Sequence, residues 1–121
     1  SNDKYEGRKT LTGPTSSGFE DLSKLKQVQL KTRYKAYQEG DRHFIKAEIK
    51  NPSSTVAFFT QLQLLDQDKK PVRPSFYTDN FFSLLPGESK TVIIETATSD
   101  MPSEPTFVVK GWNIKSNNFK L

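Results

Sequence analysis

VQLKTRYKAYQEGDRHFIKAEIK, residues 28–50, is the stretch of sequence that decides the fold. Apolar or small side chains alternate with charged or polar ones on both sides of Gly40, as in a half-buried β-strand with one wet face. The central Gln38-Glu39-Gly40-Asp41 predicts a turn in which Gly40 takes a positive φ at little cost. We therefore expect an antiparallel strand pair. The side chains expected to face the core are Val28, Leu30, Thr32, Tyr34, His43, Ile45, Ala47 and Ile49.

The rest of the sequence repeats this pattern, with turn signals about every eight to twelve residues and no convincing helix. Further strands are expected at about 56–65, 90–96 and 106–114, with a short edge piece around Val72 and Arg73. Pro86-Gly87 fits the central positions of a type II turn. The pattern predicts an all-β protein, an immunoglobulin-like antiparallel β-sandwich of about seven strands.

A chain of 121 residues normally forms one domain. Residues 1–18 contain Gly, Pro, Ser and Thr and offer little to bury, so we expect a flexible linker or tag remnant. The sandwich is expected over residues 19–121. The sequence leaves open whether residues 117–121 add a last strand or form a frayed tail.

The composition excludes several classes of function. There is no cysteine and only one histidine, so we expect no disulfide, no metal site and no cofactor. The formal charge of +4 comes from cations scattered along the sequence, which argues against a nucleic-acid partner. No apolar run approaches the roughly 20 residues of a membrane helix, so no membrane partner is expected.

No catalytic residue is predicted. His43 is expected to be a structural histidine, and Asp66 and Asp68 to lie in a solvated turn, because a calcium loop needs more carboxylates. Glycoside hydrolysis needs two carboxyl groups facing each other across a bond. Glu48 and Glu95 instead fit cross-strand ion pairs.

Aromatic side chains are too numerous for one sandwich interior. Phe58 is expected to face the core, whereas Phe59 and Trp112 read on the opposite faces of their strands. Exposed aromatic rings dock on neighbouring domains or stack on sugar rings. Phe59, Tyr77 and Trp112 are therefore the candidate docking or sugar-stacking residues, the alternative being that they cover sheet edges.

The stretch TDNFFSLLPGESK, residues 78–90, has readable folding roles. Leu84 or Leu85 is expected to fill the core ahead of the Pro86-Gly87 turn, and Leu85→Ala to cost about 2–5 kcal/mol through the cavity it leaves. The side chains of Asp79 and Asn80 are expected to hydrogen bond to the preceding backbone turn.

This stretch, together with FEDLSKL at 19–25, KNPS at 50–53 and GWN at 111–113, resembles the C-terminal immunoglobulin-like domain of glycoside hydrolase family 2 enzymes, in the β-mannosidase and exo-β-D-glucosaminidase branch. The resemblance implies a non-catalytic accessory domain that packs against the other domains of its parent enzyme, whose catalytic glutamates lie in a separate barrel. It also implies a periplasmic or extracellular location. An independent carbohydrate-binding module and a partner-binding sandwich remain the alternatives. The sequence does not identify the parent's sugar, its linkage or the oligomeric state.

Overall fold

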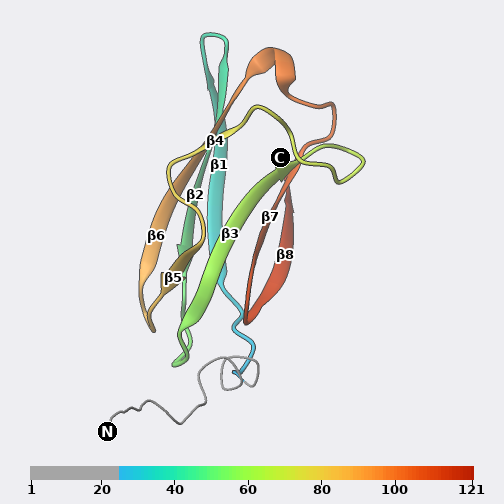
Figure 1. Cartoon of the computed structure of the whole chain (residues 1–121). Coiled ribbons are helices and arrows are strands. Elements are labelled where there is room, and N and C mark those ends of the chain that lie inside the picture. The colour runs from blue at the N-terminus through green and yellow to red at the C-terminus, as the bar shows by residue number, and fades with distance from the viewer. Residues whose placement is uncertain (1–24) are drawn as a thin grey trace, which may run out of the picture.

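The computed structural model describes residues 25–121, which form two layers of antiparallel strands (Figure 1). One sheet has the order β1-β2-β6-β4 and the other β5-β3-β7-β8. The predicted linker and the start of the lead-in lie outside these residues. The strands are β1 (Lys31–Glu39), β2 (Arg42–Lys50), β3 (Ala57–Leu65), β4 (Phe76–Tyr77), β5 (Phe82–Leu84), β6 (Ser89–Ala97), β7 (Thr106–Gly111) and β8 (Ile114–Lys120), with a 3-10 turn, η1, at Thr98–Asp100.

The predicted hairpin is confirmed. β1 and β2 pair in antiparallel register from Lys31 opposite Lys50 to Glu39 opposite Arg42. Gly40 turns the chain between them with a φ of 59°. The alternation also holds, since the inward residues of β2 are the buried ones. The side chains on this inner face are Ile45, Ala47 and Ile49.

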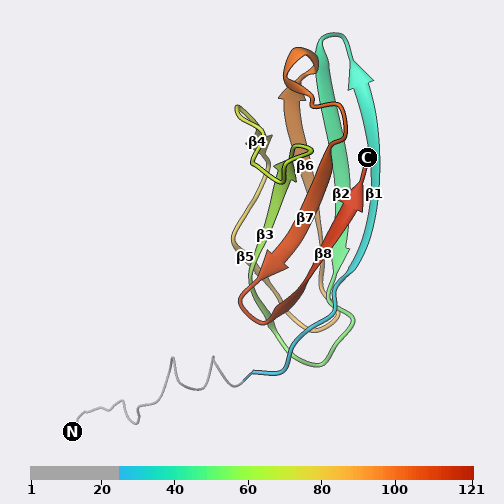
Figure 2. The ribbon, with the colours of Figure 1, turned by 90° about the vertical axis from the view of Figure 1, so that its right-hand side faces the viewer.

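The first strand begins later than the alternation predicts. Val28 is buried, but it lies outside β1 and forms an isolated parallel bridge with Ile114 of the other sheet. Its N–H donates to the Asn113 carbonyl at 2.7 Å, and its carbonyl accepts from Lys115 at 2.9 Å. The chain then crosses to β1, so that this segment rises past the lower end of β8 in Figure 2. One alternating stretch thus serves both sheets and ties them together.

The predicted C-terminal end of the last strand is wrong. β7 stops at Gly111, the chain turns, and residues 114–120 return as β8 instead of fraying. Gly111 sits where no side chain fits, because an added Cβ would collide with the Ile114 side chain and lie 2.9 Å from the Phe58 carbonyl. A glycine and a tight turn therefore divide what reads in sequence as one strand.

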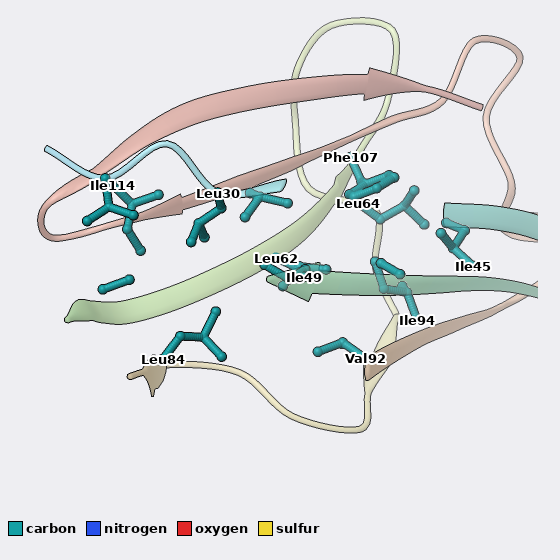
Figure 3. Packing of buried hydrophobic residues seen from close by; sticks show 14 of the residues in the cluster. Leu30, Ile45, Ile49, Leu62, Leu64, Leu84, Val92, Ile94, Phe107 and Ile114 are labelled. Carbon is teal, nitrogen blue, oxygen red and sulfur yellow. The ribbon is translucent and has the colours of Figure 1, made fainter. Parts of the chain in front are cut away.

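The core lies between the two sheets, where side chains from both layers point toward one another (Figure 3). Leu62 and Leu64 of β3 and Phe107 of β7 meet residues of β2 and β6 across this space. The facing side chains labelled there are Ile45, Ile49, Val92 and Ile94.

The turn at 85–88 corrects one core assignment. Leu84 is fully buried, whereas Leu85 is 58% exposed, so the core residue of this pair is Leu84. The type II turn itself is confirmed, since Gly87 has a φ of 81° and Glu88 N–H donates to the Leu85 carbonyl at 2.9 Å. The turn begins at Leu85, and this lifts its side chain away from the inner face.

We predict that Leu84→Ala lowers the free energy of unfolding by about 2–5 kcal/mol through a core cavity. Leu85→Ala should stay within about 0.5 kcal/mol of the wild type because its side chain is mostly solvated. Urea denaturation of the two variants measures the difference. Equal losses would show that the inward residue of this strand has been misassigned.

Candidate functional site: an aromatic row across β5, β3 and β7

β3 is irregular at its start, and this irregularity exposes aromatic rings. Its pairing with β5 shifts between Ala57 and Thr60, which accommodates an extra residue as a β-bulge. Phe59 has a φ of 57°, a left-handed conformation that is unusual for a bulky residue. Ala57 and Thr60 are buried on the inner face, so the prediction that Phe58 faces the core is wrong. Phe58 is half-buried, with its ring centroid 5.9 Å from that of Phe59.

The side chain of Asn113 fastens the β7–β8 turn to this bulge. Its Oδ1 accepts the Phe58 N–H at 2.9 Å, and its Nδ2 donates to the carbonyls of Val56 at 2.8 Å and Lys26 at 3.2 Å. Asn113 is only 2% exposed, so these bonds replace water for its own side-chain amide. Trp112 N–H in turn donates to the Phe58 carbonyl at 3.0 Å. This network places Trp112 beside Phe59.

Three exposed aromatic residues therefore cross the outer side of this sheet. Trp112 is bonded to the carbonyl of Phe58, the residue before Phe59, and Phe81 precedes β5, which pairs with β3 along its other edge. Phe81, Phe59 and Trp112 are 63%, 47% and 52% exposed. We call these three residues the aromatic row. Phe81, like Phe59, has a left-handed φ, of 58°.

Sequence reasoning found two of these residues and missed Phe81. The available signal was the pair Phe81-Phe82, because neighbouring strand residues point to opposite faces and only one of them reaches the interior. Phe82 is the one that packs against the core.

Tyr77, the third candidate, does not join the row, and its hydroxyl has a structural partner. Its strand, β4, lies toward the upper end of Figure 1, whereas the β7–β8 turn lies at the lower end. Tyr77 Oη accepts the Leu64 N–H of β3 at 2.8 Å. Burial raises the pKa of this hydroxyl, although the Leu64 N–H and the charge of Arg73 act in the opposite direction. Tyr77 thus completes the edge of β3.

Asn80 bonds to the same edge of β3 two residues earlier, at Leu62. Its Oδ1 accepts the Leu62 N–H at 2.8 Å and its Nδ2 donates to the Leu62 carbonyl at 3.1 Å. The partner is therefore β3, not the preceding turn. Asp79 Oδ1 accepts the Asn80 N–H at 2.8 Å, and its Oδ2 lies 2.5 Å from Lys90 Nζ. Lys90 first, then the Asn80 N–H, hold the pKa of Asp79 below its usual range.

The acidic residues singled out in the sequence do not form a catalytic pair. Arg33 Nε donates to Glu48 Oε1 at 3.0 Å, and Arg42 Nε donates to Glu95 Oε2 at 2.8 Å. The guanidinium of Arg33 lowers the pKa of Glu48 through this hydrogen bond and its charge. Glu48 is thus held ionised on a wet strand face and Glu95 is ion-paired with Arg42, and neither arrangement suits a general acid.

The other polar residues discussed in the sequence have local roles. His43 is half-buried, with Nδ1 3.3 Å from Thr98 Oγ1. Asp66 Oδ1 accepts the N–H groups of Asp68 and Lys70 and so organises the turn after β3. Within residues 25–121, no cluster of acidic or histidine side chains could hold a metal ion, and no helix has the length and apolarity of a membrane span.

Comparison with known proteins gives the family. A family model described as the exo-beta-D-glucosaminidase Ig-fold domain matches residues 10–114. The chain belongs to this family. The match covers the bulge of β3, the 78–90 stretch and the β7–β8 turn, so the residues that shape the aromatic row fall inside it.

The curated relatives that the chain matches are much longer enzymes, of which it spans less than a tenth. It is 41% identical over 68 residues to an exo-beta-D-glucosaminidase of Streptomyces avermitilis, which covers 54% of the chain and 8% of that enzyme. It is 38% identical over 58 residues to the Amycolatopsis orientalis exo-beta-D-glucosaminidase, covering 47% of the chain and 6% of the enzyme. The crystal structure of Amycolatopsis orientalis exo-chitosanase CsxA superposes with a TM-score of 0.76 at 27% identity, over 83% of this chain and 12% of that one.

The left-handed backbone at Phe59 predicts an inverted order of substitutions. Alanine is normally preferred to glycine in a strand, but at a φ of 57° an L side chain costs roughly 1–2 kcal/mol. Phe59→Gly should therefore be more stable than Phe59→Ala by about 1 kcal/mol. Thermal and urea unfolding of the two variants tests this. A more stable alanine variant would mean that Phe59 does not hold a left-handed conformation in solution.

Proposed function

We propose that this chain is a non-catalytic accessory domain of a multidomain exo-β-glucosaminidase-type glycoside hydrolase, and that it packs against the other domains of that enzyme. The aromatic row is the observation that carries the proposal. Phe, Tyr and Trp are enriched at protein interfaces, and Trp is among the residues that most often dominate their binding energy. Exposed rings held by a rigid network suit a permanent contact within one enzyme.

The surroundings of the row support docking as well. Next to it on the same face, Lys110 Nζ lies 3.4 Å from Gln63 Oε1, and both residues are half-buried. Aromatic anchors beside partly solvated polar groups resemble the core and rim of an interface. The two left-handed phenylalanines add a second argument, because local strain persists mainly where the rest of the fold enforces it and is concentrated at functional positions.

We infer that the chain is non-catalytic because none of the carboxyl groups of Glu48, Asp79 and Glu95 has the properties of a general acid. A glycosidase needs one carboxyl group with a raised pKa. Glu48 and Asp79 have lowered pKa values, and Glu95 is paired with Arg42. We assign the parent to β-glucosaminides and not β-mannosides because the relatives above are named as glucosaminidases. We expect purified chain to release no nitrophenol from 4-nitrophenyl β-D-glucosaminide or the corresponding mannoside.

We predict that Phe59→Ser combined with Trp112→Ser loosens the domain from its parent. In the full-length hydrolase, calorimetry should show this domain melting separately and the remaining domains losing several degrees in Tm. In the isolated chain the same double variant should shift Tm much less, because both side chains are about half exposed.

Phe76→Ser is the matched control, since Phe76 is 57% exposed but lies on the other sheet. It should leave the full-length calorimetric profile unchanged. Equal effects of the double variant on the full-length enzyme and the isolated chain would refute docking through the row.

A carbohydrate-binding module is the second candidate, favoured by the adjacency of Phe59 and Trp112. It predicts saturable binding of glucosamine oligomers to the isolated chain, abolished by the double variant. The accessory-domain proposal predicts no such binding.

A further inference from the structure

The outer face of the β1-β2-β6-β4 sheet gathers lysines that are separated in the sequence. Residues of β1 and β2 that alternate with the buried positions point away from the core. Four exposed lysines lie on this face, two on each strand, and we call them the lysine face. They are Lys31 and Lys35 of β1 and Lys46 and Lys50 of β2. The fold thus makes a cationic stripe that the sequence presents as scattered charge.

The register of these lysines is unfavourable for stability. Lys31 lies directly opposite Lys50, and Lys35 directly opposite Lys46. Like charges directly opposite each other destabilise an antiparallel pair. In residues 25–121 none of the four forms an ion pair. Glu48 lies on this face between the two lysine pairs, where it is hydrogen bonded to Arg33 and also feels the charges of Lys46 and Lys50. Glu95 is paired with Arg42.

This arrangement fits an extended anionic chain. The two lysines of each strand are four residues apart, a distance of about 13 Å, and paired strands are about 5 Å apart, so the four cations form two facing pairs at the ends of a short array. The depression bordered by Lys31, Arg33, Glu48, Lys50 and Ser89 lies within it. A linear polymer with repeating anionic groups would meet several cations at once and would relieve the repulsion between them.

Three other occupants fit less well. Lysine is depleted at protein interfaces, so the parent enzyme is better served by the aromatic row. A glucosamine polymer with protonated amines carries the same charge as this face and is repelled. Nucleic-acid bases need open ring faces. On this face Tyr37 and Phe44 stack on each other, with ring centroids 5.1 Å apart and planes at 13°.

We propose that the lysine face binds a linear anionic polysaccharide, through carboxylate or sulfate groups that repeat along an extended chain. Binding is electrostatic, so it weakens steeply as salt rises. In the free protein the repulsion between opposite lysines lowers stability. A bound anionic polymer would neutralise this repulsion.

Affinity electrophoresis and calorimetric titration of the full 121-residue chain test this proposal. The probes are polygalacturonate, dextran sulfate, uncharged dextran, glucosamine oligomers and single-stranded DNA. We expect binding to one or both anionic polysaccharides at low ionic strength, with loss of about tenfold or more in affinity on reaching about 0.15 M salt. The two anionic probes distinguish carboxylate from sulfate as the preferred group. Uncharged dextran and glucosamine oligomers should not bind.

Two triple variants, each removing three positive charges, distinguish a local binding site from attraction to the protein's overall positive charge. Lys31→Gln/Lys35→Gln/Lys46→Gln should weaken polysaccharide binding about tenfold or more at low salt and raise Tm, as repulsion is removed. Lys69→Gln/Lys70→Gln/Lys115→Gln, all exposed positions elsewhere, should change neither markedly. The proposal is overturned by no binding, by equal losses in the two triples, by a lower Tm in the first triple, or by tighter binding of DNA than of either polysaccharide.

Discussion

At the lower end of the sandwich, the side-chain amide of Asn113 bonds to three backbone groups that no strand pairing satisfies. These groups are the N–H of Phe58 and the carbonyls of Val56 and Lys26. They belong to the start of β3 and to the segment that enters the sandwich, while Asn113 itself belongs to the β7–β8 turn. Leaving a buried polar group such as the Asn113 amide without partners costs about 1–3 kcal/mol, and its three bonds join the turn to both segments. Asn51 does the same below β6, donating to the carbonyls of Thr55 and Leu84.

Two features of the structure shape the two outer faces of this small sandwich. On one sheet, the Asn113 junction holds the bulge of β3 and presents the aromatic row. On the other, the continuous β1–β2 pairing holds four lysines in a register that electrostatics alone would disfavour. The two faces proposed for protein contact and for polyanion binding thereby lie on opposite sides of the core. A domain of this kind can be fixed to an enzyme through one face while the other stays in water.

Strands whose side chains alternate without interruption could be predicted from the sequence. Positions where the alternation breaks could not. β2 and the Gly40 turn were predictable because apolar period and turn chemistry agree there. The bulge at Phe59 was not, because a left-handed phenylalanine is imposed by tertiary hydrogen bonds and not by local preference. The end of β7 at Gly111 depends on contact with Ile114 and Phe58, again beyond local pattern. Asn113, Asn80 and Tyr77 bond to backbone groups far away in the sequence, so their roles could be suspected from the motifs but not assigned. The lysine face likewise needed the register of β1 and β2.

The central claim is that the Asn113 amide holds the β3 bulge in place, and amide hydrogen exchange of Phe58 tests it most directly. In the folded protein the Phe58 N–H should be protected to nearly the level of Leu62, a neighbour bonded independently to Asn80. In Asn113→Ala, protection of Phe58 should fall sharply while that of Leu62 is retained. Protection of Phe58 that is unchanged in Asn113→Ala, or a Phe58 N–H that exchanges freely in the wild type, would contradict this account.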